Sequence, residues 1–347
     1  APTNYGEYYA QSALVYAAVK LRADAIARPP LRAYRVLPDE SKELLPADHE
    51  LPALLAKVNS HWTWGDLIRA TSIYLDLWGT AYWALTKASP TSPPAEIWVL
   101  RPDHTRVIID TKGELKGFTY TQHGRQIPLL PTEVIFFRLF NPLDEYAGLS
   151  PMAPLRLSVD MAREALKSNR NLFKEGLLFS NVHIKFPGPV TDQEVDSFYR
   201  RLRKRFAGPD AAYRPLITGD NADAKNLGFP PKDMEHVQTM RWSLEDVSRV
   251  YGVPKTLLAD LEHSTYSNID AEERMFWRNA IVPHLLFLQG EIQEMLVPQF
   301  GADLRVEFDV SEIEALQENA SQVVDRLLKQ IQSGVLTINE ARADLGK

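Results

Sequence analysis

The sequence predicts an α+β protein in which long helices are joined to a strand-rich body. Three observations lead to this prediction. Residues 96–140 contain several short strand-like segments, residues 150–175 show one uninterrupted helical pattern, and the alternating strand–helix pattern of a nucleotide-binding fold is missing. A chain of 347 residues is long for one compact domain, so we expect two or more domains.

The first 148 residues predict a mixture of helices and short strands. Apolar residues at helical spacing indicate helices over 8–28, 49–58 and 63–77. Pro29-Pro30 ends the first of these helices, and Gly79 ends the third. Extended segments are expected over residues 31–37, 81–86, 97–100, 106–110, 115–122 and 134–137, with a hairpin turn at Asp110 to Gly113.

Two long helices flank a small inserted module. Ser150-Pro151 is typical of a helix start, and the helix that follows runs to about Glu175, a length of about 38 Å at 1.5 Å per residue. Residues 179–229 then predict a β-α-β module. Its strands are expected at 182–186 and 215–218, and its helix opens with a capping box of Thr191 and Glu194.

The second long helix is predicted over residues 231–252. Its apolar seam repeats every three or four residues, which fits one continuous helix, although Ser243 with Asp246 could instead start a new helix there. A third long helix is predicted over 271–296 with Pro283 inside it. This proline removes the hydrogen bond to the carbonyl of Asn279 and should kink the helix.

The end of the chain predicts one strand and two short helices. The strand is expected over residues 304–308. Ser311 with Glu314 is expected to cap one helix and Thr337 with Glu340 a second, with Ser333-Gly334 between them.

Composition excludes several classes of function. The chain has no cysteine, which rules out disulfides, thiolate metal sites and cysteine nucleophiles. A net charge of −6 argues against tight binding of nucleic acid over a broad surface. No apolar run approaches the roughly 18–20 residues of a membrane span. The start at Ala1-Pro2-Thr3 has no methionine and no basic-then-apolar leader, which predicts a trimmed chain and not an exported one.

Catalytic motifs are absent from the sequence. It has no phosphate-binding glycine loop, no Gly-x-Ser-x-Gly elbow and no His-Glu-x-x-His zinc pattern. The eight histidines are scattered along the chain. Gly148-Leu149-Ser150-Pro151 is better explained as a helix cap than as a nucleophilic serine. We therefore predict a protein that is not an enzyme and that needs no metal or cofactor.

A basic run is the strongest charge feature. One interpretation is a solvated helix end, where cations favour the C-terminal dipole and the acidic Asp192 and Glu194 suit the opposite end. Its functional alternatives are contacts to acidic residues of a neighbouring copy, to a partner protein, or to DNA phosphates. The candidate residues are Arg200, Arg201, Arg203, Lys204 and Arg205.

A polar stretch without glycine lies between the second and third long helices, at residues 259–270. An ordinary surface connection is one explanation. The other is a functional site, because two long helices would hold such a loop in position.

Short motifs follow one another in a specific order along nearly the whole chain. Each motif alone is weak, whereas their order and spacing together are specific. They are His49-Glu50-Leu51 with Leu54-Leu55 and Asn59; Leu77-Trp78-Gly79-Thr80-Ala81-Tyr82; Leu100-Arg101-Pro102; Gly148-Leu149-Ser150-Pro151; Tyr251-Gly252-Val253-Pro254 with Leu257-Leu258; Thr265-Tyr266-Ser267-Asn268; Pro283; and residues 334–342, Gly-Val-Leu-Thr-Ile-Asn-Glu-Ala-Arg.

This set resembles the portal proteins of tailed double-stranded DNA bacteriophages, in the branch common among phages with long tails. Glu50 and Thr80 depart from the residues frequent in that family, and neither lies in the polar loop. The resemblance implies a ring, usually of twelve subunits, with a wing (1–148 and 253–310), stem helices (149–178 and 231–252), a clip (179–230) and a crown (311–347).

The resemblance also implies roles for the polar loop and the basic run. The loop at about 259–270 would be a tunnel loop beside a kinked helix, 271–298, and the basic run would bind partners of the clip. Expected partners are further copies of the chain, double-stranded DNA, a large terminase, a head–tail adaptor, and capsid and scaffolding proteins, at a capsid vertex of the virion and in the host cytoplasm during assembly. The tunnel lining would be Asp260, Glu262, His263, Ser264, Thr265, Tyr266, Ser267 and Asn268.

Two other functions stay open on the sequence alone. A DNA-processing enzyme would hydrolyse DNA or ATP unaided, and a scaffolding or adaptor protein would form no central channel. An electron micrograph showing a ring with a hole separates the portal from both. Within the portal hypothesis, the kink at Pro283 would let the loop move; unchanged loop mobility and packaging in Pro283→Ala would contradict that idea.

Overall fold

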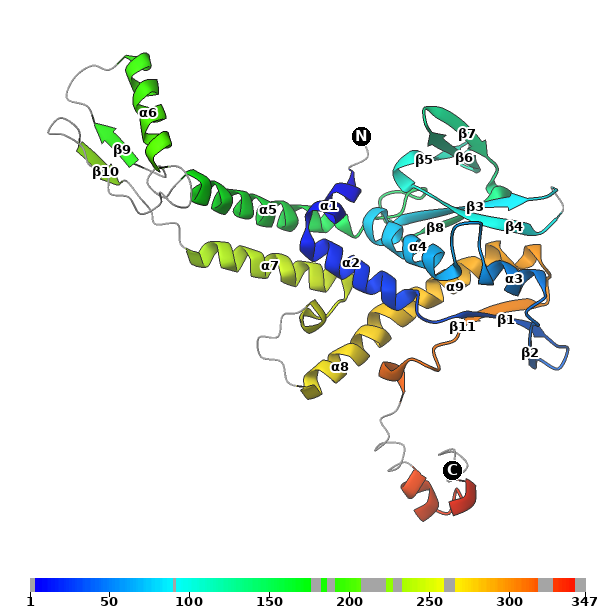
Figure 1. Ribbon diagram of the computed structural model, residues 1–347. Coiled ribbons are helices and arrows are strands. Elements are labelled where there is room, and N and C mark those ends of the chain that lie inside the picture. Colours follow the sequence, from blue (N-terminus) through cyan, green and yellow to red (C-terminus); the bar gives the residue numbers. More distant parts are fainter. Residues whose placement is uncertain are drawn as a thin grey trace. The chain divides into compact units, whose positions relative to one another are not determined.

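The computed structural model describes residues 4–89, 92–175, 182–185, 191–206, 223–226, 233–258, 266–317 and 327–340 (Figure 1). Its contacts divide the chain into two compact units. The first contains Ala1–Asn4, Ala17–Ser150 and Tyr251–Lys347, and the second contains Tyr5–Tyr16 and Pro151–Val250. The mixed α+β class predicted from the sequence is confirmed.

In its described ranges, the first unit holds three antiparallel sheets of three strands each. In the first sheet, β1 (Leu31–Val36) lies between β11 (Leu304–Phe308) and β2 (Lys42–Leu44). Leu31 pairs with Phe308, so this sheet joins segments more than 270 positions apart. The other two sheets have the orders β4-β3-β8 and β5-β6-β7; their strands are β3 (Thr80–Lys87), β4 (Pro94–Leu100), β8 (Val134–Arg138), β5 (Thr105–Ile109), β6 (Leu115–Gln122) and β7 (Arg125–Leu129).

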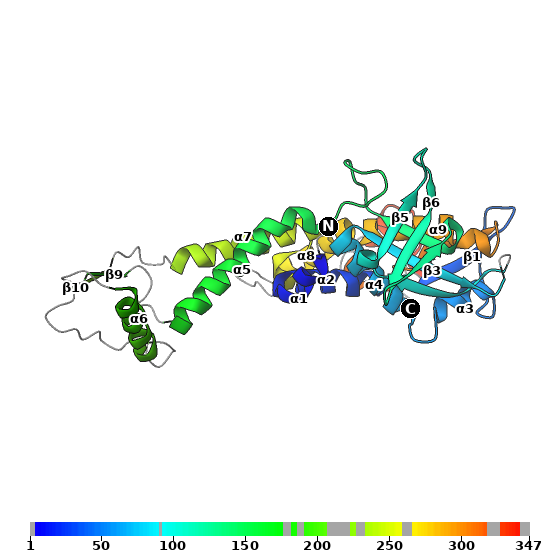
Figure 2. The same ribbon diagram turned by 90° about the horizontal axis from the view of Figure 1, so that it is seen from above.

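Helices cover the sheets of the first unit. α4 (Trp64–Trp78) packs on β3 and β4, and α9 (Val282–Met295) packs on β8 and β11 (Figures 1 and 2). α4 starts with the capping box of Thr63 and Asp66, in which each side chain bonds the other residue's backbone N–H. Other helices of this unit are most of α2 (Ala13–Ile26), α3 (Glu50–Ala56) and α8 (Tyr266–Phe276), and residues 327–332 and 338–340 are also helical.

The core of the first unit lies on both faces of β3. Trp83 is fully buried beside the rings of Trp64 and Phe137, and its indole N–H donates to Thr71 Oγ1 of α4 at 2.7 Å. On the other face, Tyr82 stacks on Phe136 at 4.8 Å between ring centroids. Because neighbouring residues of a strand point to opposite faces, β3 is buried on both sides and shows no polar alternation.

Gly79 lets the end of α4 approach residues 148–150 closely. It has φ +73°, and a Cβ there would lie 2.4 Å from the backbone oxygen of Leu149. Ser150 adds a hydrogen bond from its hydroxyl to the carbonyl of Leu77 at 2.5 Å. Only glycine tolerates both this conformation and this contact, which explains why the helix ends here.

The described residues of the second unit form four helices and a two-stranded antiparallel sheet. The helices are α1 (Tyr5–Gln11), α5 (Met152–Glu175), α6 (Asp192–Phe206) and α7 (Asp233–Tyr251), whose last residue belongs to the first unit. Tyr8 donates to Asp160 Oδ2 at 3.0 Å and joins α1 to α5, while Ser158 donates to Asp246 and joins α5 to α7. The sheet pairs β9 (Val182–Lys185) with β10 (Asp223–Asn226). α7 runs through Ser243 without a new start.

Several predicted boundaries differ from the structure. The helix expected over 8–28 is divided at Ser12, whose Oγ accepts a hydrogen bond from Val15 N at 3.4 Å and so starts a second helix. Strands β2, β7 and β10 were not predicted, since the residues of β2 are all exposed, those of β7 are mostly exposed, and neither shows alternation. The strand predicted at 215–218 lies outside the described residues.

The end of the chain is partly as predicted. Ser311 and Glu314 do not cap an α-helix, since Glu314–Leu316 form a 3₁₀ turn and Ser311 bonds Asp309. Residues 327–332, before Ser333-Gly334, are helical. Thr337 and Glu340 form the expected capping box, with Thr337 N donating to Glu340 Oε2 at 2.8 Å. Within the described ranges, every helix is too short or too polar to cross a bilayer.

Candidate functional site

The predicted tunnel loop is flanked by two described segments of the first unit. A 3₁₀ turn, Lys255–Leu258, precedes it, and α8 follows it from Tyr266. The first five candidates fall outside the described residues, whereas the last three form the first turn of α8. They are Asp260, Glu262, His263, Ser264 and Thr265, and then Tyr266, Ser267 and Asn268.

The expected start of the third long helix is corrected from residue 271 to Tyr266. No glycine or proline occurs between Lys255 and Val282, so nothing in this stretch forbids helix. Thr256 also donates a hydrogen bond from its hydroxyl to the carboxylate of Glu272. This contact joins the 3₁₀ turn to α8.

The chain leaves α7 through a tight left-handed turn. Gly252 has φ +64°, and a Cβ at this position would lie 3.1 Å from the Cβ of Ala280. Val253, the next residue, is buried. The residues that follow α7 therefore pack against the segment that joins α8 to α9.

That joining segment is a π-helical turn, Trp277–Ile281, directly before Pro283. The N–H of Val282 donates to the carbonyl of Trp277, five residues back, instead of four. Pro283 has no N–H to offer to Asn279, as the sequence predicted, and a π turn is one way for a helix to absorb the loss. The single α-helix predicted over 271–296 is thus interrupted at this point.

Arg22 connects four elements around this turn. From α2, its Nε donates to Asp76 Oδ2 of α4 at 3.0 Å, and its Nη1 donates to the carbonyl of Tyr251 at 2.7 Å. Its Nη2 lies 3.4 Å from His284 Nδ1 of α9. The phenol of Tyr251 then donates to the backbone oxygen of Asp76 at 3.1 Å. We call Arg22, Asp76, Tyr251 and His284 the Arg22 cluster.

Burial decides the charges of the Arg22 cluster. The side chains of Arg22 and Asp76 are 11% and 2% exposed. Burial raises the pKa of Asp76, and the adjacent guanidinium opposes that shift. Burial also raises the pKa of the Tyr251 phenol and, with help from the charge of Arg22, lowers the pKa of His284 to about 3.

The tautomer of His284 follows from its neighbour. A guanidinium can only donate hydrogen bonds, so His284 Nδ1 must accept from Arg22 and the ring proton lies on Nε2. This Nε2 is buried and finds no hydrogen-bond partner among the described residues. The imidazole therefore serves the Arg22 cluster as a neutral acceptor.

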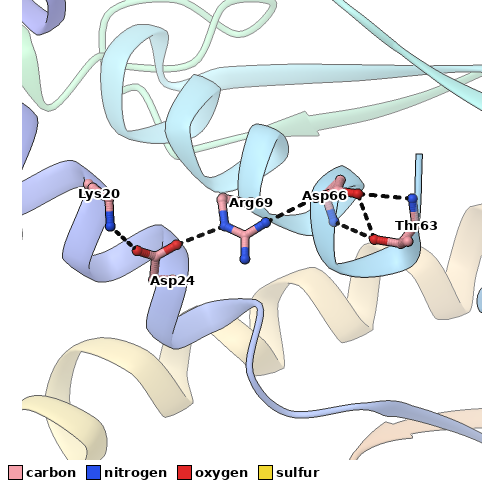
Figure 3. A network of polar contacts seen from close by, with 5 residues as sticks. All are labelled: Lys20, Asp24, Thr63, Asp66 and Arg69. Atoms are coloured by element: carbon pink, nitrogen blue, oxygen red, sulfur yellow. Dashed lines mark hydrogen bonds and ion pairs between the residues drawn. The ribbon is translucent and has the colours of Figure 1, made fainter. Parts of the chain in front are cut away.

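A second Arg–Asp pair joins the same two helices at the surface. Arg69 Nε of α4 donates to Asp24 Oδ1 of α2 at 2.8 Å, and Lys20 pairs with the other oxygen of Asp24 at 2.6 Å (Figure 3). Arg69 also reaches Asp66, which takes part in the capping box with Thr63. Both Arg69 and Asp24 are more than one third exposed, so this network contributes little.

The basic run lies on α6, as predicted. Arg200 is exposed, and its Nε donates to the carbonyl of Asp196 at 3.3 Å. Asp192 and Glu194 lie at the opposite, N-terminal end of α6, where acidic groups suit the helix dipole. The side chains of Arg201, Arg203, Lys204 and Arg205 lie outside the described part of the chain.

Two aromatic residues at the start of the π turn are buried. Phe276 and Trp277 are only 3% and 2% exposed within the single chain, so they belong to its own core. Arg28 lies over the ring of Trp277 at 5.7 Å. Trp242 differs, because it is exposed.

The sequence contained a signal for the Arg22 cluster that the prediction missed. Arg22 follows Val15, Ala18 and Val19 at helical spacing, in the apolar phase of its helix. Asp76 likewise follows Ile68, Thr71 and Ser72 on the buried side of α4. Charged residues in the apolar phase of two helices suggest a buried pair, because neither could be buried alone.

Arg22→Met should be far more destabilising than Arg69→Met, although both remove an Arg–Asp pair between α2 and α4. Loss of Arg22 leaves Asp76 buried without its cation, which costs about 3–5 kcal/mol. Loss of Arg69 costs less than about 1 kcal/mol, because water solvates Asp24. Urea unfolding of both variants and the wild type measures the two costs. Equal, small costs would contradict the role given to Arg22.

Acid should destabilise the wild type more than His284→Asn, whose amide oxygen can replace Nδ1 as acceptor. The pKa of His284 is about 3 when folded and 6.5 ordinarily, so the unfolded chain binds the proton more tightly. Its contribution is complete above pH 6.5 and falls as the pH drops, by about 1.4 kcal/mol per pH unit. At pH 5 the wild type should have lost about 2 kcal/mol more than the variant in urea unfolding. Equal losses would show that His284 is not buried neutral.

Comparison with known proteins gives one consistent family. The family described as phage portal protein matches residues 13–346. The portal protein of Enterobacteria phage HK97 is 22% identical over 336 residues, covering 96% of this chain and 78% of that protein. The probable portal protein of Streptomyces phage phiC31 is 21% identical over 347 residues, covering 96% and 74%.

Solved structures agree in fold. A chain from the neck of a native gene transfer agent particle, computed with C12 symmetry, has a TM-score of 0.70 at 24% identity and covers 99% of this chain and 94% of its own. An HK97-family phage portal protein from Corynebacterium diphtheriae has a TM-score of 0.64 at 15% identity, covering 91% and 98%. With a family match over nearly its whole length, this chain belongs to the phage portal protein family.

Proposed function

We propose that this portal protein forms a ring at a capsid vertex and that DNA passes through the centre of the ring, past residues 259–268. The observation that carries the proposal is the family match over residues 13–346. The similar chain in the gene transfer agent neck lies in an assembly with C12 symmetry, which supports a ring of twelve here. A portal protein is a structural component and not an enzyme, so packaging energy must come from a separate terminase.

The chemistry of the loop suits brief contact with a moving polyanion. Ser264, Thr265, Ser267 and Asn268 offer hydroxyl and amide groups that exchange weak hydrogen bonds with phosphates. A ring of lysines would instead release counterions and hold DNA tightly. Asp260 and Glu262 add repulsion, and His263 and Tyr266 complete the proposed lining. A net charge of −6 on each subunit fits the same low affinity.

The Arg22 cluster supports this proposal by holding the end of α7, before the loop, and the start of α9, after it. Arg22 bonds the last residue of α7 and contacts His284, the third residue of the helix that continues α8 beyond the π turn. These two anchor points would recur in every subunit of a ring, and α8, between the loop and the π turn, carries none of the cluster's residues. We propose that Pro283 is the hinge about which α8 moves, because the helical hydrogen-bond pattern is already interrupted there.

The remaining parts keep the roles that the resemblance implied. We propose residues 1–148 and 253–310 as the wing, 149–178 and 231–252 as the stem, 179–230 as the clip and 311–347 as the crown. In the clip, Arg200, Arg201, Arg203, Lys204 and Arg205 would bind acidic surfaces of the terminase or the head–tail adaptor. The ring would assemble with capsid and scaffolding proteins in the host cytoplasm and remain in the virion.

A lysine in the loop should slow DNA passage. Ser264→Lys adds one cation per subunit, so twelve subunits would surround the DNA with twelve new charges. We expect fewer heads to be filled with a full-length genome in a fixed time. The filling rate should recover as the salt concentration rises, because counterion release makes the added DNA affinity salt-dependent. Ser264→Asn is the matched control and should package normally.

Packaging by Ser264→Lys at the wild-type rate and with the wild-type salt dependence would place the loop away from DNA. Electron microscopy of each variant must first show rings of normal diameter. Failure of the wild type to form rings would contradict the proposed function itself.

A further inference from the structure

We propose that Trp242 of one subunit inserts into the groove between α1, α5 and α7 of the next subunit, which is a second copy of this chain. The inference rests on the proposed ring and identifies the contact that closes it. All the residues concerned belong to the second unit.

The receiving groove is apolar and open. It has a volume of about 350 Å³, and its lining includes Tyr8, Leu14, Val159, Leu166 and Met240. Leu166 and Met240 are 51% and 41% exposed, although their surroundings are largely apolar. A groove of this kind on a monomer leaves apolar area in water that a partner would cover.

A second apolar surface carries Trp242. This indole is 55% exposed, and Leu157 and Met161, one turn apart on α5, are 72% and 47% exposed. Met161 and Trp242 line one shallow hollow together with Ser158 and Ser243. Tryptophan is the residue type most enriched at the energetic centres of protein interfaces, because it buries a large rigid area. The surface of Leu157, Met161 and Trp242 therefore suits a protein partner.

The two surfaces lie on opposite sides of the same stretch of helix. Met240 and Trp242 are two positions apart on α7, which is about 200° around a helix with 3.6 residues per turn. Met161 and Leu166 are five positions apart on α5, about 140° around. Ser243 lines both hollows, which places the surfaces at one level along the helices.

Such a pair of surfaces is what a ring requires. A ring closed by rotation alone joins one patch of each subunit to a different patch of the next, whereas a two-fold dimer joins a patch to itself. Two distinct apolar surfaces at one level satisfy the first arrangement. In a lone subunit both would remain in water.

The charges around the surfaces are complementary. Among the described residues, the groove lining includes three cations, Arg163, Lys167 and Arg170; Lys167 also pairs with Glu164 on the same helix, and Tyr8 of the lining donates to Asp160. Beside Trp242 lie Glu245 and Asp246, and Arg249 lines that hollow and pairs with both. Opposite net charges would orient the indole toward the groove and disfavour contact of like faces.

Cross-linking tests the contact cleanly, because the chain has no cysteine. Full-length Trp242→Cys and Leu166→Cys proteins are mixed during assembly and treated with a short bis-maleimide. We expect covalent dimers in the mixture and none in either protein alone, which serves as the matched control. Met161→Cys, on the same surface, replaces Trp242→Cys in a parallel mixture and leaves the indole in place.

Each outcome decides the proposal. Dimers confined to the mixtures support it. Dimers in Trp242→Cys alone would indicate a two-fold contact and overturn it. Rings that form in the Met161→Cys and Leu166→Cys mixture without cross-links would also overturn it, while the proposed function stands. If the wild type forms no ring, the proposed function fails first.

Discussion

The buried ion pair between Arg22 and Asp76 is the contact on which the first unit depends. The guanidinium of Arg22, on α2, bonds the carboxylate of Asp76 on α4, the carbonyl of Tyr251 at the end of α7 and the imidazole of His284 on α9. It therefore joins four helices from distant parts of the chain. Arginine suits this position because its planar fork carries several fixed donors, which lysine lacks. Burying the pair costs desolvation free energy. Removing one partner costs more stability, because it leaves the other charge buried without a counter-ion.

The contacts of Arg22 also bracket the segment that contains residues 259–268, because they reach Tyr251 before it and His284 after it. Tyr251 closes α7, Gly252 turns the chain against Ala280, and the π turn leads into Pro283 and His284. The proposed channel needs an anchored segment, and it needs residues that bind DNA only weakly. Different parts of the sequence meet these two requirements. In a ring, twelve copies of a weak contact would act together, so position matters more than the affinity of any one side chain.

The sequence predicted elements whose own pattern is strong. The helices over 63–77 and 150–175, the strand at 304–308 and the capping box at Thr337 follow local chemistry, and the structure contains them. It did not predict features decided by distant contacts. Arg22 and Asp76 form a buried pair that neither helix pattern shows alone, α8 begins at Tyr266 and not at residue 271, and Phe276 and Trp277 are covered by the chain's own core. For residues 259–268, the residue types suggest weak contact with DNA, whereas their position relative to a ring axis depends on how the subunits assemble.

A three-dimensional reconstruction of the assembled protein tests whether residues 259–268 line the channel, because it measures their radial distance from the symmetry axis. We expect a ring in which these residues lie nearer the axis than the rest of the chain, with the segments held by Arg22 directly behind them. A ring whose channel is lined by other residues, with 259–268 on its outer rim, would contradict it.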